Sequence, residues 1–210
     1  MIEEIIRKVL GMSPGTRKIN QDLASMRQII RPFQAQLIPF QEERELELMS
    51  LKLDLKSQKK GLDKITAGTI LSIYSEPMVA FAFKEYIKAE RDALLCCRTS
   101  HIEVIFRIKK QGVDVYFNGN QVAMIDQNNV LHGLKSRGIL GRIRPYSTDL
   151  LSVIVKDKEV GQMFNPLRPH TYQQRAFTLL SHLDDEEEAI FIALCLFELL
   201  TRMLVKKGKN

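Results

Sequence analysis

The sequence predicts an α+β fold, in which a closed antiparallel β-barrel surrounds a buried hydrophobic C-terminal helix and a small helical N-terminal region precedes it. Three observations predict this fold. A hydrophobic helix lies at the end of the chain, short strand-like segments separated by turn residues fill its middle, and helical periodicity marks its beginning. We therefore divide the chain into a helical N-terminal region, residues 1–60, and a barrel domain, residues 61–210.

Apolar residues recur at helical spacing in the first part of the chain. Residues 2–10 predict one helix, which the turn-forming segment 11–15 ends, and residues 17–30 predict a second, which Pro32 interrupts. A third helix is expected from about Gln41. Residues 51–55 alternate in a way that fits either a strand or a helix, and the basic segment 56–64 is the expected boundary. The apolar stripe of the second helix consists of Ile19, Leu23, Met26, Ile29 and Ile30.

Short apolar segments with turn residues between them predict strands beyond the boundary. The clearest is a hairpin over residues 113–125, because its Asn118-Gly119 turn takes the positive φ angles that a tight turn requires. Residues 151–163 repeat this pattern, and residues 138–143 form a further strand with glycines where a sheet can bend. Other strands are expected over 69–74, 78–83, 93–97 and 101–108.

The C-terminal helix has signals at both ends. Asp184 and Glu187 have the spacing of a capping box, and Lys206 and Lys207 lie where the helix dipole favours cations. Residues 189–197 are apolar on every side, so protein or lipid must surround them. Because Glu198 and Arg202 then follow one turn apart, the segment is too short and too charged for a membrane anchor. We expect a core helix, with Glu198 and Arg202 paired where it emerges.

Residues from about 65 to 205 resemble the superfamily of tubby C-terminal domains, phospholipid scramblases and LURP-one-related proteins. The resemblance rests on the terminal helix 189–204, the paired hairpins 113–125 and 153–163, and Gly141-Arg142-Ile143 between them. It implies a twelve-stranded barrel that encloses a hydrophobic C-terminal helix. It also implies a binding domain, since tubby members dock phosphoinositide headgroups and scramblase members are linked to lipid movement. The cysteine-rich and proline-rich leader of scramblases is not found in this sequence.

Composition predicts a cytoplasmic protein with no transmembrane segment and no signal peptide. A peripheral location at a membrane is compatible with this prediction. Cys96 and Cys97 are adjacent and Cys195 lies in the apolar helix, so no disulfide framework is expected. The net charge of +6 allows anionic partners. Nucleic acid is not expected as a partner, because aromatic residues are few and do not alternate with dense Lys or Arg.

Motifs of catalysis and metal binding are weak in this sequence, so we expect no enzyme, no cofactor and no metal site. Residues 11–15 match Gly-x-Ser-x-Gly, but they follow a helix and Pro14 lacks the N–H that an oxyanion hole needs. The four histidines are dispersed. Cys96 and Cys97 would point to opposite faces of a strand. Residues 126–129 suggest a turn rather than a calcium loop.

Basic residues are the remaining candidates for a site. Guanidinium groups in a cluster can hold a phosphate with two parallel hydrogen bonds. The candidate anion-binding residues are Lys135, Arg137, Arg142, Arg144, Arg168 and Arg175. They lead to the hypothesis of a non-catalytic domain that recognises anionic phospholipid headgroups, or another phosphate-bearing ligand, at a membrane surface. The alternative is an adaptor whose residues 1–60 bind a protein partner or a second copy of the chain.

Overall fold

The computed structural model describes residues 14–39, 43–60, 63–86, 92–135, 138–168 and 174–207, which form three helices and twelve strands. The helices are α2 (Thr16–Gln34), α3 (Glu43–Leu46) and α4 (Asp185–Lys207). The strands are β1 (Met49–Lys60), β2 (Asp63–Ser72), β3 (Pro77–Glu85), β4 (Ala93–Arg98), β5 (Glu103–Lys109), β6 (Gly112–Phe117), β7 (Asn120–Ile125), β8 (Val130–Gly133), β9 (Ile139–Pro145), β10 (Leu150–Val155), β11 (Lys158–Phe164) and β12 (Phe177–Leu179). The helix expected over residues 2–10 lies outside the described residues.

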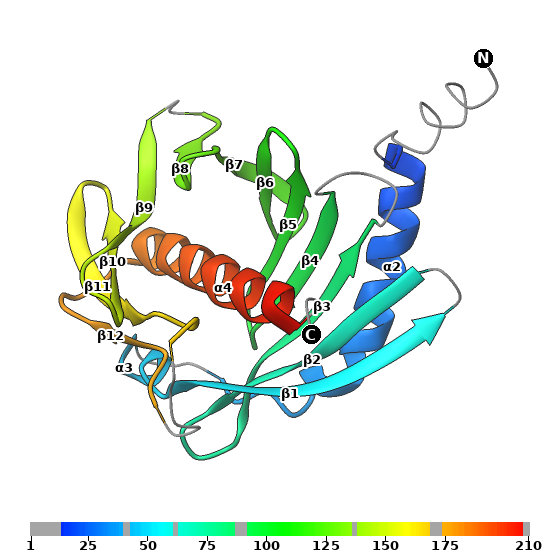
Figure 1. Ribbon diagram of the computed structural model, residues 1–210, viewed down its shortest axis with the longest axis horizontal. Coiled ribbons are helices and arrows are strands. Elements are labelled where there is room, and N and C mark those ends of the chain that lie inside the picture. Colours follow the sequence, from blue (N-terminus) through cyan, green and yellow to red (C-terminus); the bar gives the residue numbers. More distant parts are fainter. Residues whose placement is uncertain are drawn as a thin grey trace.

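The twelve strands form one antiparallel sheet in sequential order, from β1 to β12. The sheet curves around α4 as a nearly closed barrel (Figure 1). At the seam the two edge strands do not pair as a ladder; a single bridge joins Ser50 to Arg175, and the Ala176 N–H donates to the Met49 carbonyl at 2.7 Å. The α+β class and the antiparallel barrel of the sequence prediction are thus observed, but the barrel is nearly closed, whereas the prediction was a closed one.

Tight turns fix the register of the two predicted hairpins. Asn118 and Gly119 have φ angles of 47° and 85°, and Lys156 and Asp157 have 47° and 64°. Positive φ at both central residues gives a turn whose twist matches that of the strands it joins. The β6–β7 and β10–β11 hairpins are therefore confirmed.

The C-terminal helix α4 lies inside the ring of strands (Figure 1). Six consecutive residues, from Phe191 to Leu196, are each at most 3% exposed. The predicted capping box is present, since the Glu187 N–H donates to Asp184 Oδ1 at 2.8 Å and the Asp184 N–H donates to Glu187 Oε2 at 3.2 Å. Glu198 and Arg202 form the expected ion pair. Within the described ranges, no helix has the length and apolar character needed to cross a bilayer.

The structure of the N-terminal part of the chain, residues 16–60, corrects two expectations. Residues 49–60 form strand β1 and pair with β2, so the sheet begins at Met49 and the N-terminal region is not helical as far as residue 60. The alternation over residues 51–55, which fitted both periods, is that of a strand with one side facing the barrel interior. Pro32 does not end α2, because a proline in the last turn removes only a terminal hydrogen bond and the helix stops two residues later.

Helix α2 covers the outside of the barrel. Its stripe of Ile19, Met26 and Ile30 is buried against small and aliphatic residues of β2 to β5, among them Ala82 and Leu94. This outer core is separate from the core inside the barrel. The stripe was expected, in the adaptor hypothesis, to bind a partner; it is instead occupied within the chain.

Candidate anion-binding pocket

A second row of α2 residues, next to the buried stripe, lines an open pocket of about 480 Å³. Arg27, Arg31 and Gln34 are four and three residues apart, so they share one face of the helix. The opposite wall comes from the barrel. The residues that line the pocket are Arg27, Gln28, Arg31, Gln34, Arg98, Glu103 and Asn118.

Among the described residues that line the pocket, Glu103 is the only acidic one, and two arginines bind it. Arg27 donates through Nε to Oε1 at 2.9 Å and through a terminal nitrogen to Oε2 at 2.6 Å. Arg98 approaches Oε1 at 3.8 Å from β4. The Glu103 side chain is only 6% exposed, and its hydrogen bond to Arg27 is the main reason that the pKa of Arg27 is raised. This pair holds α2 against the start of β5.

The backbone around Glu103 is fixed by the β6–β7 turn. The Glu103 N–H donates to Asn118 Oδ1 at 3.0 Å, and the Asn118 N–H donates to the Glu103 carbonyl at 2.9 Å. Asn118 takes a left-handed φ of 47°, which asparagine adopts more readily than most residues. The turn therefore sets the position of the carboxylate on which the arginines converge.

The pocket carries excess positive charge. Its described lining contains three guanidinium groups and one carboxylate. In the part of the chain that the structure describes, the Arg31 side chain makes no hydrogen bond or ion pair, and the side chain of Arg98 is 38% exposed. Exposed guanidinium groups in a concave site are suited to an anion with several oxygen acceptors, such as phosphate.

A buried polar cluster holds α2 at a second place, nearer its beginning. Asp22 accepts hydrogen bonds from Lys84 Nζ at 2.9 Å and from the Tyr86 hydroxyl at 2.7 Å. The side chains of Lys84 and Asp22 are 2% and 7% exposed. Lys18 Nζ, one turn earlier on α2, lies 3.2 Å from Asp22 Oδ1, the oxygen that also accepts from Lys84. Such a buried pair requires both partners, because removal of one leaves a charge in a poorly solvated position.

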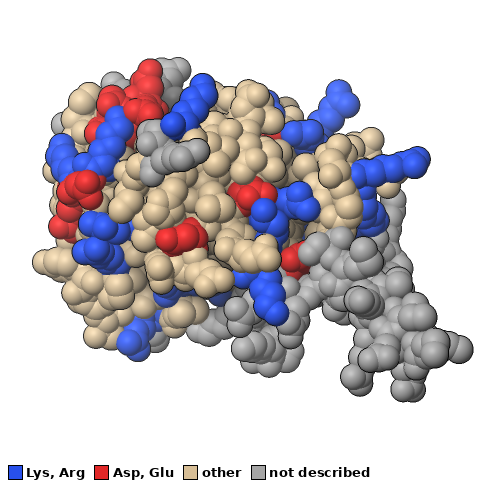
Figure 2. Space-filling view, turned by 90° about the horizontal axis from the view of Figure 1, so that it is seen from above, with Lys and Arg blue, Asp and Glu red and all other residues tan. Residues whose placement is uncertain are grey.

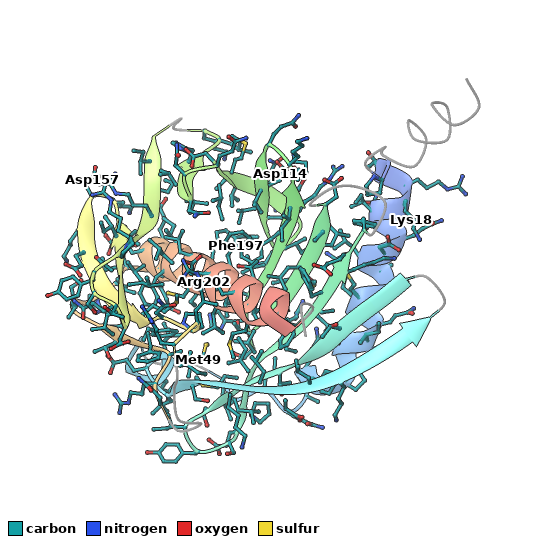
Figure 3. The ribbon with its side chains drawn as sticks, viewed as in Figure 1. Lys18, Met49, Asp114, Asp157, Phe197 and Arg202 are labelled. Carbon is teal, nitrogen blue, oxygen red and sulfur yellow. The ribbon has the colours of Figure 1, made fainter. Side chains whose placement is uncertain are left out.

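The basic residues predicted from the sequence do not line this pocket. Arg137 lies outside the described residues. Arg142 and Arg144 share the outer face of β9. Arg142 Nη2 lies 3.6 Å from Asp157 Oδ1. Figure 3 shows Asp157 on the opposite side of the molecule from Lys18 of α2.

The other three predicted residues are dispersed as well. Lys135 precedes β9, and the five residue steps of the strand from Ile139 to Arg144 alone span about 17 Å at 3.3 Å per residue. Arg168 donates to the Thr148 carbonyl at 3.1 Å, beside the end of β9, and Arg175 pairs with Glu47 at the seam. Figure 2 shows basic and acidic side chains interspersed over one face of the molecule rather than gathered by sign.

Sequence reasoning missed the pocket because its residues come from separate segments. One signal was available: Arg27 and Arg31 are like charges at i and i+4, an arrangement that is unfavourable on an isolated helix and calls for an anion nearby. Nothing in the sequence near Arg98 or Glu103 indicated that they would face this helix.

The cysteines have no features of nucleophiles. Cys96 lies in the outer core under α2 and Cys97 in the inner core, so the two thiols do face opposite sides of β4 as predicted. Burial raises the pKa of Cys96 to about 12 and that of Cys97 well above its usual value. Among the described residues, no three metal-ligating side chains come together. Gly15, the described end of the Gly-x-Ser-x-Gly match, is the N-cap of α2.

Comparisons of the chain with protein-family models, with curated proteins and with solved structures found no match.

Proposed function

We propose that this protein is a non-catalytic binding domain that holds a phosphate-bearing ligand in the pocket between α2 and the barrel. The observation that carries the proposal is the charge of the pocket, whose described lining contains three arginines, Arg27, Arg31 and Arg98, and one carboxylate, that of Glu103. Two positive charges are therefore left for a ligand. A phosphate monoester carries nearly two negative charges near neutral pH, so the charges match.

The polar lining supports the same ligand class. Gln28, Gln34 and Asn118 contribute amide groups beside the arginines, and about 480 Å³ is within the range of small-molecule sites. A sugar or inositol phosphate has the hydroxyl groups that such amides bind. Because the pocket is open to solvent, the phosphate can also belong to a lipid headgroup at a membrane surface.

The architecture supports kinship with the tubby, scramblase and LURP-one-related superfamily. Twelve antiparallel strands in sequential order surround a C-terminal helix, which is the arrangement that the resemblance implies (Figure 1). The proposed kinship favours a binding domain over an enzyme. It does not by itself choose a ligand, since one fold carries many functions.

Titration calorimetry with soluble inositol trisphosphate tests the pocket. Replacing Arg31 by Gln removes one unpaired guanidinium without disturbing the Arg27–Glu103 pair. Loss of a hydrogen bond to a charged group costs about 1.5 to 3 kcal/mol, so we expect Kd to rise by at least tenfold. Arg144→Gln on β9 is the matched control, with a Kd within twofold of the original. A Kd that responds to Arg144 and not to Arg31 would place the ligand on β9 instead.

Vesicle flotation distinguishes a lipid headgroup from a soluble ligand. If the ligand is a lipid, the protein should float with anionic vesicles, and Arg31→Gln should reduce the recovery. Equal recovery with neutral and anionic vesicles, together with tight binding of the soluble inositol phosphate, would assign the pocket to a free phosphate compound.

A further inference from the structure

The walls of the pocket belong to two different parts of the fold. Arg27, Arg31 and Gln34 come from α2, whereas Arg98 and Glu103 come from the barrel. Helix α2 lies outside the sheet and contributes no backbone hydrogen bond to the strand ladders. Its departure would open the pocket and leave the hydrogen-bonded barrel in place.

Between described residues, side-chain contacts join the middle of α2 to the barrel. These contacts include the apolar outer core, the Arg27–Glu103 pair at the pocket, and the Asp22 cluster with Lys84 and Tyr86. The Asp22 cluster is distant from the Arg98 side of the pocket. Arg98 pairs with Ala80 of β3, and Lys84 lies four residues further along the same strand, about 13 Å away. A group that touches no part of the pocket therefore helps to hold one of its walls.

We infer that ligand binding and the docking of α2 are coupled, so that α2 acts as a movable wall and the Asp22–Lys84 contact regulates the affinity of the pocket from a distance. The inference rests on the proposed function, because it concerns the same pocket. A ligand held by arginines of both walls binds only the docked state. It therefore stabilises that state. Anything that releases α2 raises the apparent Kd, which equals the Kd of the docked state divided by the fraction of molecules that are docked.

Coupling is reciprocal, which gives two independent readouts. The ligand must slow the detachment of α2, and a variant that detaches α2 must weaken the ligand. A site built on the barrel alone would do neither. The same holds for a site on α2 alone.

Hydrogen exchange of the α2 amides, residues 16–34, measures detachment in the unmodified chain. With inositol trisphosphate at 100 times its Kd, the docked state is favoured by about 100-fold, so exchange through detachment should slow by about the same factor. Unchanged α2 exchange at saturation, with calorimetric binding intact, would overturn the coupling and leave the proposed function standing. Absence of any calorimetric binding would overturn both.

The second readout uses Asp22→Ala, which removes the carboxylate that binds Lys84 and Tyr86. We expect faster exchange over residues 16–34 and a Kd raised by at least tenfold. Ser25→Ala, an exposed position on the same helix, is the control and should change neither. Faster α2 exchange in Asp22→Ala with an unchanged Kd would contradict the inference. If Asp22→Ala does not fold, the exchange measurement on the unmodified chain decides the question.

Discussion

At the scale of single residues, two glycines determine how closely the central helix approaches the sheet. A methyl group on Gly161 would lie 2.8 Å from the Phe191 ring and 2.8 Å from the Thr178 carbonyl oxygen. One on Gly141 would lie 2.8 Å from Leu194 and 2.7 Å from the Ile154 carbonyl oxygen. All four distances are shorter than van der Waals contact. These glycines therefore make room for α4 and for the neighbouring strands.

Gly161→Ala should destabilise the protein, because an added methyl group in a packed core forces its neighbours to move. Overpacking of this kind costs about 1 to 3 kcal/mol in the free energy of unfolding, which urea denaturation measures. Part of that cost should disappear in the background of Phe191→Leu, since the ring is one of the two groups in the way. Equal costs in both backgrounds would mean that α4 does not pack against this strand.

Residue-level prediction from the sequence succeeded where the relevant contacts are local. The Asp184–Glu187 capping box and the Glu198–Arg202 pair each join residues within one helical turn, and the opposite faces of Cys96 and Cys97 follow from strand geometry. The glycines were predicted only as positions where a sheet can bend. Their contact with α4 depends on packing between distant segments, which no local pattern records.

At the scale of elements, the start of α4 is stabilised by charge. Asp184 caps the helix, and Lys156 of the β10–β11 turn lies 3.6 Å from Asp184 and 2.6 Å from Glu186. The hydrogen bond from the Glu187 N–H is the main reason that the pKa of Asp184 is lowered, with the Lys156 charge acting in the same direction and desolvation opposing them. The acidic residues at this end are thus explained by the helix terminus and its basic neighbour.

Removal of this cap should have an effect that depends on pH. Because the pKa of Asp184 is lower in the folded state than in the unfolded chain, its contribution is complete above the unfolded value of about 3.9 and is lost as the pH falls through the folded value. Asp184→Ala should therefore unfold at lower denaturant concentration at pH 7. The difference from the original protein should shrink only below about pH 4. A difference that stays constant down to pH 3 would show that the carboxylate charge does not stabilise α4.

Elements were predicted from the sequence with uneven success. The β6–β7 and β10–β11 hairpins have turns with a strong signal, and α2 has a clear apolar stripe. Two short strands, β8 and β12, were missed because four and three residues carry no measurable alternation. The stripe of α2 showed that one side of the helix is buried, and the choice between the barrel and a partner required the fold.

At the scale of the whole molecule, the barrel uses both sides of its wall. The inner face packs around α4, where Phe106 and Phe197 have ring centroids 5.2 Å apart; Figure 3 shows Phe197 within the ring of strands. The outer face of β2 to β5 packs against α2. The second layer creates the pocket, since Arg27 on α2 meets Glu103 only when the helix is docked on the barrel, and Arg31 of the same helix lines the pocket.

The sequence predicted this architecture better than it predicted the site. A helix that is apolar on every side, combined with many short strands, leaves few arrangements other than a barrel around the helix. The site depends on which charged residues meet across α2, β4 and β5. Clusters that are close in sequence, such as Arg142 and Arg144, attracted the prediction, whereas Arg27 and Arg98 are far apart in the chain and adjacent only in the fold.

A crystal structure of the protein with bound inositol trisphosphate tests the assignment of the pocket most directly. We expect phosphate oxygens within hydrogen-bond distance of Arg31 on α2 and Arg98 on β4, with the Arg27–Glu103 pair retained. Inositol trisphosphate bound instead to Arg142 and Arg144 on β9, with the α2 pocket free of ligand, would contradict it.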